Sequence, residues 1–135
     1  MRRPPLRSEC YGRGGDFFFA LGSLLVFTAT DATNGTELWV SDGTAGGTML
    51  LKDIRAGSTS GSVGQPVVLG SKAYFSANDG TVGAELWETD GTPTGTVLTK
   101  DIRTGTNSGS PTSLARLGSK IYFSATNGTS TGQFG

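Results

Sequence analysis

The stretch Glu37–Thr48, ELWVSDGTAGGT, decides the fold because it returns further along the chain as Glu85–Thr96, ELWETDGTPTGT. The similarity extends on both sides of this stretch. Gly22–Leu69 aligns with Gly70–Leu117 without a gap, and more than half of the positions are identical. A third copy begins at Gly118, at the same spacing. Self-similarity at a fixed period of this length is the signature of a repeat architecture.

Charge and composition argue against several classes of function. Lys plus Arg and Asp plus Glu both number 11, but Arg2, Arg3, Arg7 and Arg13 all precede the repeats, so the chain from Asp16 onward is acidic. An acidic region offers no electrostatic footprint for nucleic acid. The only cysteine is Cys10, so there is no disulfide framework. The absence of histidine removes the commonest general base and zinc ligand.

Each copy contains four short runs with the residue pattern of β-strands, separated by turn residues. No segment has the apolar period of an amphipathic helix. The predicted strands are 24–30, 36–41, 48–53 and 66–69 in the first copy, and 72–77, 84–89, 96–101 and 112–117 in the second. This arrangement predicts an all-β fold of tandem four-stranded repeats, which form β-propeller-like blades in an incomplete array.

The first run of each copy carries large side chains on both faces. Alternation places Phe27, like Phe75 and Phe123, on one face, and Val26, like Tyr74 and Tyr122, on the other. We therefore expect these strands to be covered on both sides.

The turn after the second run has the sequence Asp-Gly-Thr-x-x-Gly-Thr. Asp42 and Asp90 can accept hydrogen bonds from backbone N–H groups two residues on. The glycines are expected to adopt positive φ, which costs glycine nothing; they are Gly43, Gly47, Gly91 and Gly95. This pattern predicts a β-hairpin slightly longer than the two-residue ideal.

The repeat register divides the chain into four parts: residues 1–15, an irregular leader expected to be disordered; 16–69, the first repeat; 70–117, the second; and 118–135, the start of a truncated or degenerate third. Phe17–Phe27 follows several arginines and resembles a signal peptide. We favour a strand because Leu21-Gly22-Ser23 keeps the repeat register. A closed propeller needs about four to eight blades, so we expect a fragment or an array that associates with other copies.

The motif Glu-Leu-Trp-x-x-Asp-Gly-Thr occurs at Glu37–Thr44 and Glu85–Thr92, followed each time by Gly-Thr and then Lys-Asp-Ile. From about Leu21 to Gly128 the chain resembles the bacterial ELWxxDGT repeat proteins. The third copy departs from the pattern, because Gln133-Phe134-Gly135 stands where Glu-Leu-Trp is due. The resemblance implies a propeller-like repeat of a large exported or cell-surface bacterial protein, and it implies no activity.

The repeat signature also supplies the candidate site residues, Glu37, Trp39, Asp42, Glu85, Trp87 and Asp90. Glutamate and aspartate could act as an acid–base pair in a glycosidase-like cleft. Exposed tryptophans could stack on sugar rings. We favour structural roles, in which the carboxylates accept turn and strand-end hydrogen bonds, and each tryptophan packs between blades and finds a partner for its N–H.

No catalytic residue, metal ligand or cofactor is assigned. Calcium in the loop Asp79–Glu85 is kept as a minor alternative, since this loop lacks the alternating ligands of an EF-hand. The sequence thus predicts a non-enzymatic structural or adhesion segment at the bacterial cell surface. Its partners would be further repeats, other copies of the chain, or a surface glycan or protein. A carbohydrate- or protein-binding propeller module is the alternative, and part of a propeller hydrolase is the third.

Overall fold

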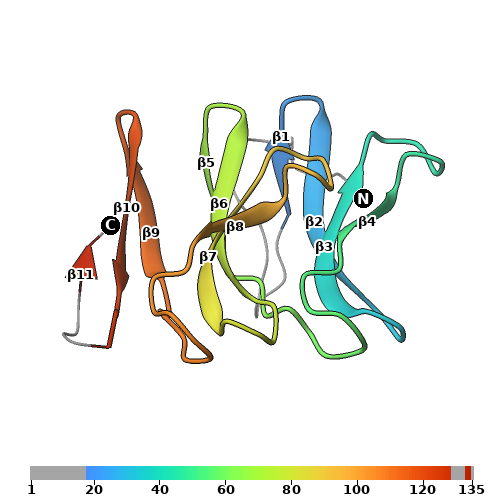
Figure 1. Ribbon diagram of the computed structural model, residues 1–135. Coiled ribbons are helices and arrows are strands. Elements are labelled where there is room, and N and C mark those ends of the chain that lie inside the picture. The colour runs from blue at the N-terminus through green and yellow to red at the C-terminus, as the bar shows by residue number, and fades with distance from the viewer. Residues whose placement is uncertain (1–17, 129–132, 135) are drawn as a thin grey trace.

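The computed structural model describes residues 18–128 and 133–134 (Figure 1). Within these residues the protein is all-β: every element is a strand, and the strands form three antiparallel sheets. The prediction of an all-β fold without helices is confirmed for this part of the chain. No helix in it is long and apolar enough to cross a membrane. The predicted leader, residues 1–15, lies outside the described residues.

Each sheet is built from strands that follow one another along the chain. The first sheet has the order β1 (Phe18–Leu21), β2 (Leu24–Asp31), β3 (Gly35–Ser41), β4 (Met49–Lys52). The second has the order β5 (Val67–Leu69), β6 (Lys72–Asn78), β7 (Ala84–Thr89), β8 (Val97–Lys100). The third has the order β11 (Gln133–Phe134), β10 (Lys120–Ala125), β9 (Thr112–Leu117). Local pairing of this kind needs only short hairpin connections.

The strands begin and end close to where the sequence predicts. The Phe17–Phe27 run is divided at Gly22, whose φ of +61° allows the two-residue turn between β1 and β2. The last predicted strand of the first copy, β5, pairs with β6 and therefore belongs to the second sheet. A sheet thus combines the last strand of one sequence copy with the first three of the next.

Strand register is the same in the first two sheets. Phe27 lies opposite Trp39 across β2 and β3, and Phe75 lies opposite Trp87 across β6 and β7. The ladder to the next strand is irregular at corresponding places, between Leu38 and Trp39 in one sheet and between Leu86 and Trp87 in the other. Such irregularities increase the local twist of a sheet.

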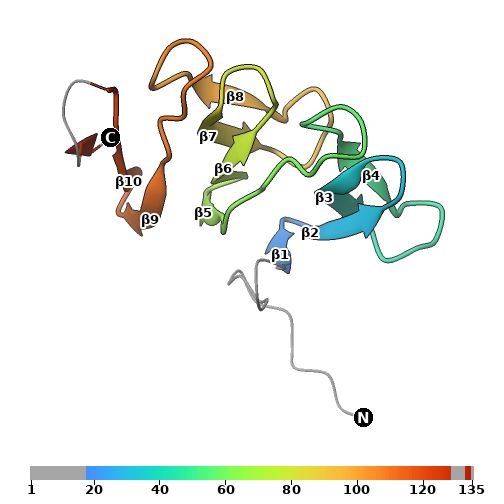
Figure 2. The same cartoon turned by 90° about the horizontal axis from the view of Figure 1, so that it is seen from below.

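Figure 2 shows the three sheets side by side, with β1, β5 and β9 on the same side of the arrangement. The hydrophobic core lies between the first two sheets. The first sheet and its following connection contribute seven buried residues, Phe19, Leu21, Val26, Leu38, Val40, Leu51 and Ile54, and the second contributes Ala73, Phe75, Ala77 and Trp87. Alternation along β2 and β6 therefore directs the Val26 face of the first sheet against the Phe75 face of the second.

Burial of corresponding positions depends on where each sheet lies. Phe75 and Val26 are both 0% exposed, whereas Phe27 is half-buried and Tyr122 is 42% exposed. The expectation that the first strand of every copy is covered on both faces is therefore wrong for β10, because no described sheet packs on its Tyr122 face. Among the described residues, no sheet packs on the Phe27 face of the first sheet or on the Tyr122 face of the third.

Candidate functional site

The carboxylate of Glu85 organises the long connection that follows β8. Its side chain is 0% exposed. Oε2 accepts a hydrogen bond from the N–H of Ile102 at 2.7 Å, and Oε1 accepts one from Gly109 at 2.6 Å. A Cβ on Gly109 would lie only 2.6 Å from Oε2, so glycine permits this approach. The acid satisfies backbone donors that would otherwise be buried without partners.

Glu37 occupies the corresponding position in the first sheet and is also fully buried. Its carboxylate accepts hydrogen bonds from the N–H groups of Ile54, at 3.1 Å, and Arg55, at 3.2 Å. Burial, together with the negative charge of the nearby Asp53, raises the pKa of Glu37 to about 7, while the backbone donors oppose the shift. These polar contacts make Glu37 a structural acid held by the chain around it.

The first half of each Asp-Gly-Thr turn forms as the sequence predicts. Asp42 Oδ1 accepts the N–H of Thr44 at 2.9 Å, and Asp90 does the same with Thr92, also at 2.9 Å. Hydrogen bonds from the hydroxyl and the backbone N–H of the threonine lower the pKa of both aspartates. Gly43 has a φ of +95°, so its expected conformation is confirmed.

The second glycine of each turn has a different role from the one predicted. Gly47 and Gly95 are absent from the positive-φ residues, so that expectation is wrong. A Cβ at Gly47 would overlap the carboxylate of Asp42, and Gly95 has the same relation to Asp90. Glycine is needed there for space around the turn carboxylate, a contact that the spacing alone does not reveal.

The tryptophans differ in exposure but share one unexpected feature. Trp87 is 6% exposed and belongs to the core between the first two sheets, whereas Trp39, on the open face of the first sheet, is half-buried. Among the described residues neither indole N–H has a hydrogen-bond acceptor, which contradicts the expectation of a partner. Asp53 and Asp101, which were not among the predicted site residues, each bury an Oδ1 without a described partner.

The loop considered for calcium uses its oxygens in turns. Asp79 Oδ1 accepts the N–H groups of Thr81, at 2.7 Å, and Val82, at 2.9 Å, while Asn78 Oδ1 accepts that of Gly80 at 2.7 Å. The carboxylate of Glu85 instead accepts hydrogen bonds from the connection after β8. Within the described residues, no group of three or more acidic, histidine or cysteine side chains could hold a metal ion.

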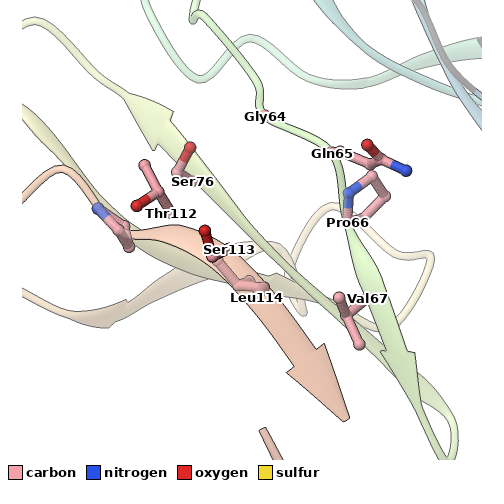
Figure 3. A pocket seen from close by; sticks show the side chains of 9 residues that line it. Gly64, Gln65, Pro66, Val67, Ser76, Thr112, Ser113 and Leu114 are labelled. Atoms are coloured by element: carbon pink, nitrogen blue, oxygen red, sulfur yellow. The ribbon is translucent and has the colours of Figure 1, made fainter. Parts of the chain in front are cut away.

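A cavity of about 370 Å³ lies between the second and third sheets (Figure 3). It is lined by Gly64–Val67 and Ser76 from the second sheet and its entry segment, and by Pro111–Leu114 from the third. None of these residues is ionisable. Prediction from sequence missed this site, because its two walls come from different sheets and carry no recognisable motif.

The structure does not gather the six signature residues in one cleft. The glutamates bind backbone N–H groups, the aspartates lie in exposed turns, and the tryptophans lie on sheet faces. Comparison of the chain with family models, curated proteins and solved structures gives no match.

Proposed function

We propose that the chain is a non-enzymatic structural module whose sheets stack on one another as propeller-like blades. Its partners would be further blades, from a longer protein or from other copies of the chain. The observation that carries this proposal is the contrast between two equivalent aromatic pairs. Phe75 and Trp87 are buried against the first sheet, while the equivalent Phe27 and Trp39 are only half-buried.

The opposite open face belongs to the third sheet. Tyr122 on β10 corresponds to Val26 on β2, the side chain that packs against the Phe75 face in the core. Tyr122 is 42% exposed and Leu117, on β9, is 72% exposed. Contiguous exposed apolar side chains mark interaction surfaces. The Phe27 face of the first sheet thus corresponds to the Phe75 face of the second, and the Tyr122 face of the third sheet corresponds to the Val26 face of the first. These are the two kinds of face that already pack together in the core.

The use of the carboxylates supports a structural role. Glycosidase chemistry needs two carboxyl groups facing a common substrate. Glu37 and Glu85 are engaged by backbone N–H groups, and Asp42 and Asp90 close turns. Part of a hydrolase would need an acid pair from additional blades. Stacking of sugars on Trp87 would require the core between the sheets to open, because this side chain is 6% exposed.

Location follows only from the resemblance to exported and surface-attached repeat proteins. On that basis we assign the module to the bacterial cell surface, as a scaffold or adhesion element. Fractionation of the source bacterium with an antibody against the chain tests this assignment. Recovery in the cytosol alone contradicts it.

Sedimentation velocity of two end variants tests the stacking. Phe27→Asp places a charge on one open face and Tyr122→Asp places one on the other. We expect the wild-type chain to associate with increasing concentration, each variant to stay monomeric, and their equimolar mixture to form dimers through the one undamaged pair of faces. A wild-type chain that stays monomeric at high concentration contradicts the proposal. Association unaffected by either variant contradicts it as well.

A further inference from the structure

We propose that the cavity between the second and third sheets is a binding site for a neutral hexopyranose, free or at the end of a glycan. This proposal goes beyond the structural role above and uses none of the signature residues. It rests on the cavity itself, on the uncommitted polar groups of its wall, and on a backbone distortion that occurs at this wall.

The size of the cavity suits a small ligand. Its volume of about 370 Å³ is more than ten times the roughly 30 Å³ that one water occupies in the liquid. It lies near the lower end of ligand pockets, which span about 300–1,000 Å³. A single sugar ring is therefore a suitable occupant.

The lining has the chemistry of a sugar site. Figure 3 shows Ser76, Thr112 and Ser113 gathered along one side, with Pro66 and Val67 across from them. Within the described part of the chain the hydroxyls of Ser76, Thr112 and Ser113 form no hydrogen bond. Hydroxyls both donate and accept, so they match the hydroxyls of a sugar. Apolar side chains can contact the C–H groups of its ring, and the lack of charge disfavours an ionic ligand.

The distortion lies at Ser113, which has a φ of +57°, a conformation that non-glycine residues rarely adopt. Across the hairpin, Ala115 pairs with Tyr122 and Thr112 pairs with Ser124, so Ser113 and Leu114 both lie opposite Phe123. This is a β-bulge, a device that re-aims side chains beside functional sites. Gln65, at the corresponding position in the previous copy, does not have positive φ. Ser113 is the one cavity-lining residue with this backbone strain, because the other two non-glycine residues of positive φ in the described chain, Ser62 and Ser110, do not line the cavity. Strain of this kind at a ligand-sized cavity supports a function there.

Amide NMR titration of the full chain tests the site. The probes are the methyl glycosides of glucose, galactose and N-acetylglucosamine, with glucuronate as a charged counterpart and cyclohexanol as an apolar one. We expect at least one neutral glycoside to cause saturable shifts at Gly64, Ser76 and Ser113, with weaker binding of both counterparts. The proposal fails if no neutral glycoside does so, or if either counterpart binds as tightly.

Variants then test the hydroxyls. Ser113→Gly removes one hydroxyl and relieves the strained φ, so we expect unchanged or higher stability and roughly three- to tenfold weaker binding. Ser62→Gly is the control, because Ser62 also has positive φ but does not line the cavity; its affinity should stay at the wild-type value. Thr112→Val provides a second variant if Ser113→Gly does not fold. Wild-type affinity in the cavity variant overturns the proposal.

Ligands of different glycan length distinguish a free monosaccharide from the end of a glycan as the natural ligand. Tighter binding of a trisaccharide than of its terminal methyl glycoside indicates a glycan end, and equal binding indicates the free monosaccharide. Failure of the sugar titration leaves the stacking measurements unaffected, because the cavity residues differ from Phe27 and Tyr122. The two proposals can therefore fail independently.

Discussion

The carboxylate of Glu85 accepts a hydrogen bond from the backbone N–H of Gly109, 24 residues further along the chain, at 2.6 Å. Together with the N–H of Ile102, this contact ties the connection after β8 to the centre of the second sheet. The equivalent acid, Glu37, holds the connection after β4 in the same manner. The glutamate that opens the Glu-Leu-Trp motif therefore stabilises the loop that follows each sheet.

Glu85→Ala should strongly destabilise the protein, because it leaves buried backbone donors without partners. Each such donor costs about 1–3 kcal/mol, so we expect a loss of about 3 kcal/mol or more in the free energy of unfolding. Glu88→Ala is the matched control on the same strand. It breaks a partly exposed ion pair with Lys72, and such pairs contribute about 0–1 kcal/mol. Urea unfolding measures both, and equal losses would contradict the role of Glu85.

Phe75→Ala and Phe27→Ala change the same repeat position in two environments. Phe75 is 0% exposed in the core, so its truncation should cost about 3–5 kcal/mol. Phe27 is half-buried on an end sheet, and its truncation should cost clearly less in dilute solution. At high concentration Phe27→Ala should also weaken self-association. Denaturation at two protein concentrations measures these effects, and equal losses in dilute solution would show that the end face is already covered.

Gly47→Ala should destabilise the β3–β4 hairpin because the new Cβ would displace the Asp42 carboxylate. Gly46→Ala is the matched control, since nothing lies within 4 Å of its Cβ position and its φ is not positive. That variant should be neutral or stabilising by up to about 1 kcal/mol. Thermal unfolding distinguishes them, and equal melting temperatures would refute the steric role of Gly47.

Glu37 should make stability fall as pH rises from about 4.5 to 7. Its pKa is about 7 in the folded protein against an ordinary value of 4.5. The folded state therefore holds the proton of Glu37 more tightly than the unfolded state does. The stability that this adds is fully present below pH 4.5 and is lost above about pH 7. Urea midpoints across this range measure the effect. Glu37→Gln should abolish it.

Asp42→Asn is the control for the pH experiment. The pKa of Asp42 is lowered from 3.8, so this residue contributes stability above that value which is lost as the pH falls further. Asp42→Asn should therefore change the dependence of stability on pH only at the acid end. The fall in stability between about pH 4.5 and 7, which Glu37 causes, should remain. Loss of that decline in Asp42→Asn would contradict the assignment to Glu37.

The sequence predicts the strands and turns well because both depend on local patterns. Alternation identified β2, β6 and β10, and Asp42 closes its turn with a residue only two positions away. The contacts of Glu85 escaped prediction because they span 17 to 24 residues. The bulge at Ser113 depends on how β9 meets β10, and exposure of Tyr122 depends on which sheets are present. Local patterns contain neither kind of information.

We propose that the Phe27 face of the first sheet docks another sheet. Acrylamide quenching of Trp39 fluorescence in Trp87→Phe, measured across protein concentrations, tests it most directly because Trp39 lies opposite Phe27 on that face. We expect strong quenching in dilute solution and progressive protection as the concentration rises, with Phe27→Asp abolishing the protection. Quenching that does not change with concentration would contradict the claim.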